Sequence, residues 1–261
     1  MCPSVLRRAA LLALACLSVA CARVPRAPAG IPARPSAVPR NGLEVIGGMR
    51  RAHPSRALRS LVLRVSVTEM SDTTRVHRSR IVASLPGLLR MEALPASRRT
   101  GFVRQRQHIA VFERGQRVQR VQRVDLATLM AYDVFAQSID TTIMWLDSAR
   151  VRFALLRLDE LDGRRAWVVG AFAGDTTSSQ FWVDAQEWRV IRVIQREPWN
   201  GNQLVDLRFS DFVKVESVPV PTRLLVYRGG RLVQRQEHEI LRVNPRLSRQ
   251  AFDLTRWASV E

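Results

Sequence analysis

Apolar and polar residues alternate along most of the chain, and this period of two constrains the fold more than any other feature. Leu61, Leu63, Val65 and Val67 occupy every second position of one segment, which is typical of a half-buried β-strand. Similar strand-like runs lie at residues 74–84, 88–94, 101–112, 116–124, 151–161, 164–172, 180–184, 188–196, 202–216, 222–227 and 232–243.

Short turn signals separate these runs. Arg114-Gly115, Asp162-Gly163 and Gly229-Gly230 are dipeptides that favour tight turns, and residues 198–201 read Pro-Trp-Asn-Gly. Many strands at near-regular spacing, joined by short turns, predict an antiparallel sheet of meander type. The expected fold class is therefore mainly β with a few helices, formed by one domain over residues 41–261.

Helical spacing appears in two places. Asn41 is a suitable cap for a helix that begins at Gly42 or Leu43 and ends before Pro54. Residues 125–150 interrupt the strand pattern with two predicted amphipathic helices, the second of them capped by Asp140. Either these helices form a permanent cover on one face of the sheet, or they form a movable lid.

The N-terminal segment has the pattern of an export signal. Arg7 and Arg8 precede the apolar residues 9–20, a run too short to span a bilayer, which needs about 20 residues. The run ends at Cys21 in the sequence Leu-Ser-Val-Ala-Cys, which resembles the lipobox of bacterial lipoproteins. We therefore expect residues 1–20 to be a lipoprotein signal peptide and Cys21 to carry the lipid anchor. An ordinary signal peptide cut near Ala20 is the alternative.

A proline-rich segment follows the proposed anchor. Residues 21–40 contain a proline every few positions and few large apolar side chains, which favours an extended tether. An exported protein, lipid-anchored to the cell envelope and facing the periplasm from the outer membrane, is the expected localisation.

The charge of the chain favours an anionic partner. The sequence contains 41 lysine and arginine residues against 23 acidic residues, for a formal net charge of +18. Anionic lipid headgroups are the expected contact, because nucleic acid is scarce outside the cytoplasm. Residues 116–124 repeat Gln-Arg-Val three times, and a solvated edge strand protected by charge is the favoured interpretation.

The residue patterns of common catalytic and metal sites are missing from the sequence. The three cysteines, Cys2, Cys16 and Cys21, all lie in the signal or at its end. The four histidines form no HExxH motif, and the sequence contains neither a GxSxG motif nor a phosphate-binding loop. We expect a protein without enzymatic activity, catalytic residues, metal or cofactor.

Several short motifs occur in an order that resembles a known family. They are Pro86-Gly87 followed by Arg90-Met91-Glu92, the hairpin Asp162-Gly163, the strand Phe181-Trp182-Val183-Asp184, and Val218-Pro219-Val220-Pro221. In this order, and over residues 43–252, the chain resembles the LolA/LolB-like outer-membrane lipoprotein-sorting family, the lipoprotein carriers. The resemblance implies a strongly curved antiparallel sheet, an incomplete β-barrel whose apolar concave side is covered by an N-terminal helix and central helices.

The resemblance also implies a cavity for the acyl chains of lipids or lipoproteins. We expect the central helices to be its lid, with an underside formed by Leu126, Leu129, Met130, Ile143, Met144 and Trp145. The expected function is a membrane-tethered lipid or lipoprotein carrier. The main alternative is a regulatory or scaffold protein of the envelope that binds another protein through the curved sheet. A membrane-spanning sheet and an exported hydrolase are further alternatives.

Overall fold

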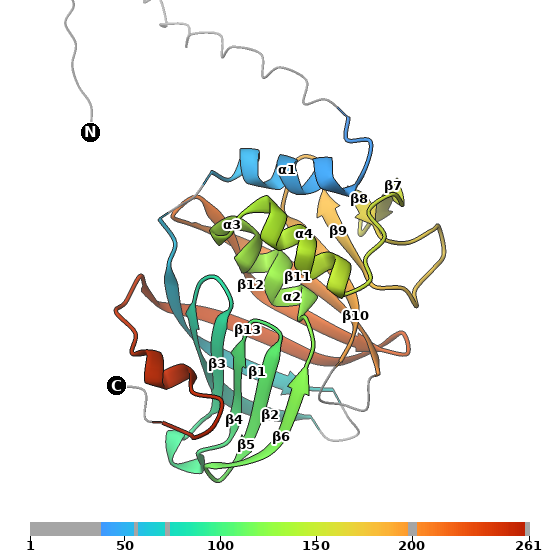
Figure 1. Ribbon diagram of the computed structural model, residues 1–261. Helices are drawn as coiled ribbons and strands as arrows, with labels where there is room; N and C mark the ends of the chain where they lie inside the picture. Colours follow the sequence, from blue (N-terminus) through green and yellow to red (C-terminus); the bar gives the residue numbers. More distant parts are fainter. Residues whose placement is uncertain (1–37, 55–56, 71–73, 198–202, 259–261) are drawn as a thin grey trace, which may run out of the picture. The chain divides into compact units, whose positions relative to one another are not determined.

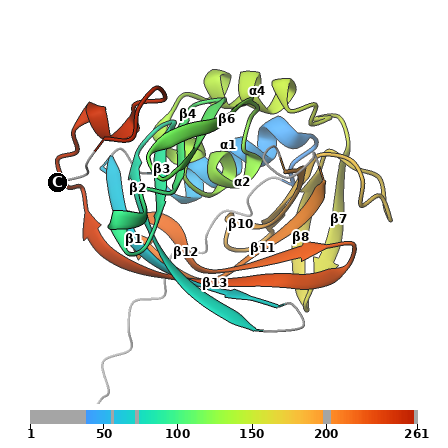
Figure 2. The same cartoon turned by 90° about the horizontal axis from the view of Figure 1, so that it is seen from below.

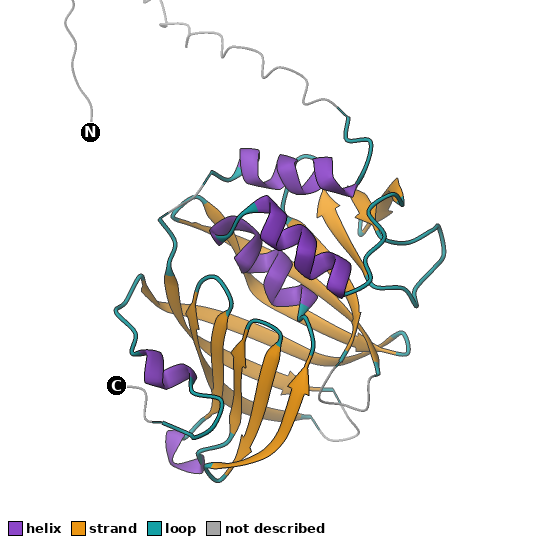
Figure 3. Ribbon diagram, viewed as in Figure 1, coloured by secondary structure: helices purple, strands orange, loops and turns teal. Residues whose placement is uncertain are grey.

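One large antiparallel sheet dominates the computed structural model, which describes residues 38–54, 57–70, 74–197 and 203–258 (Figures 1 and 3). Its thirteen strands are β1 (Ser60–Glu69), β2 (Arg75–Ser84), β3 (Leu88–Ala93), β4 (Gly101–Gln105), β5 (His108–Glu113), β6 (Gln116–Gln122), β7 (Leu156–Leu161), β8 (Arg164–Val169), β9 (Gln180–Asp184), β10 (Val190–Arg196), β11 (Leu204–Val215), β12 (Val218–Arg228) and β13 (Arg231–Val243). The prediction of a mainly β fold is confirmed.

The strand order explains how two meanders form a single sheet. The order across the sheet is β6-β5-β4-β3-β2-β1-β13-β12-β11-β10-β9-β8-β7. The first and last strands of the chain, β1 and β13, pair in the middle, while β6 and β7 form the two edges. The sheet curves strongly and does not close, and the helices between β6 and β7 cover its concave side (Figure 2).

The helices begin where polar side chains cap them. Asn41 accepts a hydrogen bond from the backbone N–H of Glu44 at 3.0 Å and so caps α1 (Gly42–Ala52), as predicted. Gly48 of α1 leaves room for the ring of Trp188, since a Cβ there would lie 2.2 Å from that ring. The remaining short helices are η1 (Ala96–Arg98) and η3 (Arg249–Phe252).

The central segment contains four short helical pieces instead of the predicted two. They are α2 (Leu126–Thr128), η2 (Leu129–Asp133), α3 (Val134–Ala136) and α4 (Ile139–Ser148), and η2 is a turn of π-helix. The prediction that Asp140 caps the last helix is wrong. Ser138 is the cap, because its hydroxyl oxygen accepts from the N–H of Thr141 at 3.1 Å.

Three strand predictions need correction. Residues 101–112 form the hairpin β4–β5, whose turn contains Arg106 at a φ of +54° and no glycine to signal it. The strand expected from residue 151 begins at Leu156. The strand expected at residues 222–227 begins earlier, at Val218, and so includes Pro219 and Pro221. In this part β12 pairs with β11 and not yet with β13, so the missing N–H groups of the prolines interrupt no second ladder. The turn predicted at 198–201 lies outside the described residues.

Buried apolar side chains form a main cluster between the concave face and the helices. It includes Ile46 and Met49 of α1, Leu126 and Met130 of the central helices, and residues of β1 and β9–β12. A second cluster lies on the convex side of β1–β5, where the C-terminal segment brings Phe252 and Trp257 against Phe112. The QRV repeat lies in the exposed edge strand β6, as the favoured interpretation predicted.

Candidate functional site

A cavity of about 570 Å³ lies between the concave face of the sheet and the central helices. Side chains from β1–β6 and β10–β13 line its walls, and side chains from α2 and η2 line its roof. Pockets that bind small organic molecules have volumes of roughly 300–1,000 Å³, so this cavity is large enough for a ligand.

One wall of the cavity is an apolar row that crosses five strands. Leu63, Ile81, Met91, Phe102 and Val111 are successive register partners from β1 to β5 and all line the cavity. A row of this kind runs perpendicular to the strands, so it offers a continuous apolar surface. The unbranched thioether chain of the methionine adapts easily to a flexible ligand.

The facing wall is apolar too. Phe209 and Leu207 of β11 are the register partners of Leu224 and Val226 of β12, and all four line the cavity. An apolar chain placed between the two walls would exclude water from both, at about 0.8 kcal/mol for each buried CH₂ group.

Hydrogen bonds attach the roof to β10. The Asp125 carboxylate accepts from the Ala127 N–H at 3.2 Å and from the Gln195 amide nitrogen at 3.1 Å. The Gln195 amide oxygen accepts from the Leu126 N–H at 2.7 Å. The first turn of the roof is therefore attached to the sheet through its backbone. Burial raises the pKa of Tyr132, which keeps the phenol that faces the cavity neutral.

A buried ion pair attaches the other end of the roof. Asp133, the last residue of η2, pairs with Arg104 of β4 at 3.1 Å and accepts from the Gly87 N–H at 2.9 Å. Burial raises the pKa of Asp133, and both contacts oppose that rise. On the outer side, the Arg50 guanidinium of α1 donates to the Val134 carbonyl at 2.7 Å.

The six side chains predicted for the underside of the lid occupy other places. Leu126, Leu129 and Met130 are buried in the main core cluster, Ile143 and Trp145 are half-buried, and Met144 is 52% exposed. The lining of the large cavity includes none of these six. Leu129, Met144 and Trp145 instead line a separate pocket of about 280 Å³ beside Arg104 and Asp133.

The roof residues that do line the cavity are Asp125, Ala127, Thr128 and Tyr132. Sequence reasoning missed them for two reasons. Asp125, Ala127 and Thr128 are small or polar, so hydrophobic periodicity does not select them. Tyr132 lies in the π-turn of η2, which shifts the helical phase away from 3.6 residues per turn. Cys21 lies outside the described residues, so the structure does not bear on the predicted anchor.

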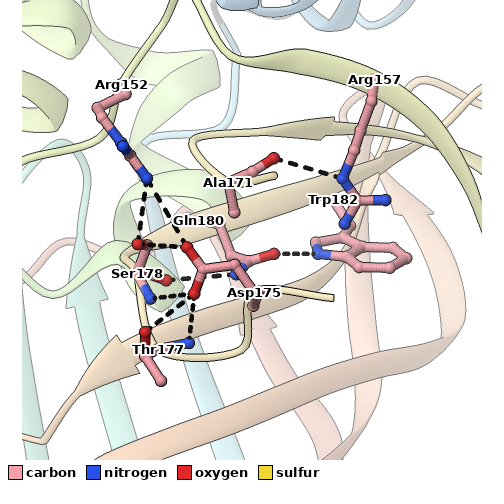
Figure 4. Close-up of polar contacts among 8 residues, drawn as sticks. All are labelled: Arg152, Arg157, Ala171, Asp175, Thr177, Ser178, Gln180 and Trp182. Carbon is pink, nitrogen blue, oxygen red and sulfur yellow. Dashed lines mark hydrogen bonds and ion pairs between the residues drawn. The ribbon is translucent and has the colours of Figure 1, made fainter. Parts of the chain in front are cut away.

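A separate cluster of polar side chains lies in the loop between β8 and β9 (Figure 4). The Asp175 carboxylate accepts from the Ser178 hydroxyl at 2.6 Å and from the Thr177 N–H at 2.8 Å, and these bonds hold its pKa well below the ordinary value. Gln180 donates to the Asp175 carbonyl at 2.7 Å and accepts from the Trp182 indole. These bonds close the loop on itself, so we interpret the cluster as structural.

Two features are absent from the part of the chain that the structure describes. In those ranges, no group of three or more His, Cys, Asp or Glu side chains is placed to hold a metal ion. None of the helices there has the length and apolar character needed to cross a bilayer.

Comparison with known proteins gives a fold but no close relative. No protein-family model matches the sequence, and no curated protein matches it either. Solved structures with a similar fold include a domain named for outer membrane lipoprotein sorting from Vibrio parahaemolyticus, with 12% identity and a TM-score of 0.54. The alignment covers 81% of this chain and 96% of that domain.

Two other solved structures also have a similar fold. A LolA superfamily protein from Nitrosomonas europaea has 14% identity and a TM-score of 0.50 over 82% of this chain and 97% of that one. A DUF1329 family protein from Desulfovibrio piger has 14% identity and a TM-score of 0.52 over 81% and 95%. The resemblance carried by the sequence motifs is thus confirmed as a shared LolA-like fold.

Proposed function

We propose that this chain is a membrane-tethered carrier that holds the acyl chains of lipids or lipoproteins in the cavity beneath the central helices. The observation that carries the proposal is the cavity itself, with two facing apolar walls from β1–β5 and β11–β12. The names of the solved structures that share the fold support it, since two of them refer to lipoprotein sorting or to LolA. Sequestration of a hydrocarbon chain requires burial and no catalytic group.

The proposed anchor places this activity at a membrane. A lipid on Cys21, followed by the proline-rich residues 22–40, would hold the domain near the bilayer surface of the cell envelope. Labelled fatty acid should enter the full-length chain expressed in bacteria and should not enter the Cys21→Ser variant. Equal labelling of both proteins would remove the anchor from the proposal.

The carrier function is tested by filling the cavity. Ile81→Trp adds bulk to the apolar wall, whereas Val76→Trp adds the same side chain at a site on β2 that is 67% exposed. We expect the first variant to weaken the binding of a fluorescent fatty-acyl probe at least tenfold, and the second to bind like the unaltered protein.

Mass spectrometry of the purified domain provides an independent test. Lipid that co-purifies with the protein and is lost in Ile81→Trp would support the carrier. If the protein binds no acyl probe and carries no lipid, the carrier is excluded and the envelope scaffold that binds a protein through the curved sheet becomes the better hypothesis.

A further inference from the structure

A patch of polar side chains without a carboxylate, lysine or arginine interrupts the apolar lining of the cavity. Gln234, Gln236 and His238 alternate along β13, and His77 and Ser79 alternate along β2, and all five line the cavity. The two groups flank β1, because Val67 is the register partner of both Gln236 and His77, and Val65 that of both His238 and Ser79. The patch therefore consists of two groups, one on β13 and one on β2, on either side of the apolar side chains of β1.

The hydrogen bonds within the patch have a defined direction. The Gln236 amide nitrogen donates to the Gln234 amide oxygen at 2.8 Å. This leaves the Gln236 amide oxygen facing the His238 Nε2 at 3.1 Å, and because an amide oxygen only accepts, Nε2 must carry a proton. Burial lowers the pKa of His238 to about 4, so the ring is neutral and its Nδ1 is an acceptor.

The patch keeps unused hydrogen-bonding capacity. The Gln234 amide nitrogen takes no part in this chain of bonds, and the buried Nδ1 of His238 has no hydrogen-bond partner among the described residues. A buried acceptor without a partner costs about 1–3 kcal/mol, which a ligand group that donates to it would recover. Uncharged donors and acceptors of this kind suit ester or amide carbonyls and hydroxyl groups.

The charged side chains of the lining oppose an anionic ligand. Arg228 is their only cation among the described residues, and it pairs with Glu197 through contacts of 2.8–3.2 Å. Asp125 and Glu113 are further carboxylates of the lining. One cation against three carboxylates gives the lining a formal excess of negative charge, although the chain as a whole has a formal charge of +18. A carboxylate or phosphate inside it would meet repulsion and no free cation.

We infer that the cavity selects neutral amphiphiles: the acyl chain lies between the apolar walls, and an uncharged ester, amide or hydroxyl group rests on the patch formed by Gln234, Gln236, His238, His77 and Ser79. This inference rests on the proposed carrier function and names its substrate class. It predicts that the cavity binds acylglycerols and similar acyl esters more tightly than free fatty acids and anionic phospholipids.

The test is competition for a neutral fluorescent dye bound to the purified protein. Monooleoylglycerol, oleate and oleylamine share one chain length and differ at the polar end, so each is titrated below its micelle concentration. We expect monooleoylglycerol to displace the dye at a concentration about tenfold lower than either charged compound. Oleate meets the carboxylates of the lining, whereas the ammonium group of oleylamine can donate hydrogen bonds but cannot accept one from the Gln234 amide, and it loses its hydration on burial.

A pair of matched variants locates the selectivity. Gln236→Leu removes the centre of the patch, while Gln122→Leu makes the same change on the exposed edge strand β6, at a residue that does not line the cavity. The first should lose most of the preference for monooleoylglycerol, and the second should keep it. The comparison of the three ligands on the unaltered protein stands even where a variant fails to fold.

Two outcomes would overturn the inference while the carrier function survives. One is equal displacement by all three compounds, and the other is a preference for oleate or oleylamine. A neutral preference that Gln236→Leu leaves unchanged would also overturn it, because the patch would then not be the cause. If none of the compounds displaces the dye, the carrier function fails and this inference fails with it.

Discussion

The guanidinium of Arg90 lies 3.8 Å from the ring centroid of Trp257, so a buried cation stacks on an aromatic ring 167 positions further along the chain. The same guanidinium donates to Glu92 at 3.1 Å and to the Ala251 carbonyl at 3.2 Å. Arg90 is 1% exposed. One side chain thus attaches the C-terminal segment to the convex face of β3 and so joins the end of the chain to the N-terminal meander.

Replacing Arg90 with lysine should destabilise the protein although the charge is kept. An ammonium group cannot stack as a plane, and it cannot bond Glu92 and the Ala251 carbonyl together in the same fork geometry. We expect a loss of about 1–3 kcal/mol in the free energy of unfolding, measured with urea. Arg256→Lys is the control, because Arg256 is exposed and its change should cost under about 0.5 kcal/mol. Equal losses in both variants would show that the stack has no special role.

The ion pair between Asp133 and Arg104 is expected to be strongly coupled. Asp133→Asn leaves a buried guanidinium without its counter-charge, and breaking a buried pair in this way costs about 3–5 kcal/mol. The double variant Asp133→Leu/Arg104→Met removes both charges and should be more stable than the sum of the two single changes predicts. A double-mutant cycle in urea measures this coupling, and additive losses would contradict it.

Leu129→Ala and Met144→Ala should differ sharply in stability. Leu129 is 3% exposed and belongs to the main core cluster, so its truncation should cost about 2–5 kcal/mol. Met144 is 52% exposed, and its truncation should change the free energy of unfolding by less than about 0.5 kcal/mol. Thermal unfolding of the ligand-free variants gives the comparison. Similar costs for both would mean that α4 packs differently in solution.

The fold could be predicted from the sequence because its signals are local. Glycine-containing dipeptides at the turns, the Asn41 cap and the alternation along each strand all act within a few residues, and each predicts the element that contains it. The hairpin turn at Arg106 was missed for the converse reason, since a residue without a turn signal adopts a positive φ there.

The residues that line the cavity could not be predicted from the sequence in the same way. Gln234, Gln236 and His238 alternate with Val233, Arg235 and Glu237, so neither face of β13 is apolar and the pattern does not tell which face is inside. Which face of β13 lies inside depends on its pairing with β1, a strand more than 160 positions away in the sequence. The position of Tyr132 in the roof depends on the π-turn at η2, whose phase hydrophobic periodicity does not reveal.

His238 should make stability depend on pH between about 4 and 6.5. In the unfolded chain a histidine titrates near pH 6.5, whereas burial lowers the pKa of His238 in the folded protein to about 4. Between these values the unfolded state binds more protons than the folded state, so the free energy of unfolding decreases as the pH falls through this window. Above pH 6.5 the ring is neutral in both states, and His238 adds no pH dependence.

The His238→Gln variant isolates this contribution, because glutamine does not titrate and can still donate to the Gln236 amide oxygen. From pH 7 to pH 4, the free energy of unfolding of the unaltered protein should fall about 3 kcal/mol further than that of the variant. Carboxylates that titrate in the same range are common to both proteins, so they cancel in the difference. Urea unfolding at half-unit pH intervals gives both curves. Parallel curves would mean that His238 reaches water readily in solution, and the neutral, proton-accepting Nδ1 assigned to the cavity wall would then have to be abandoned.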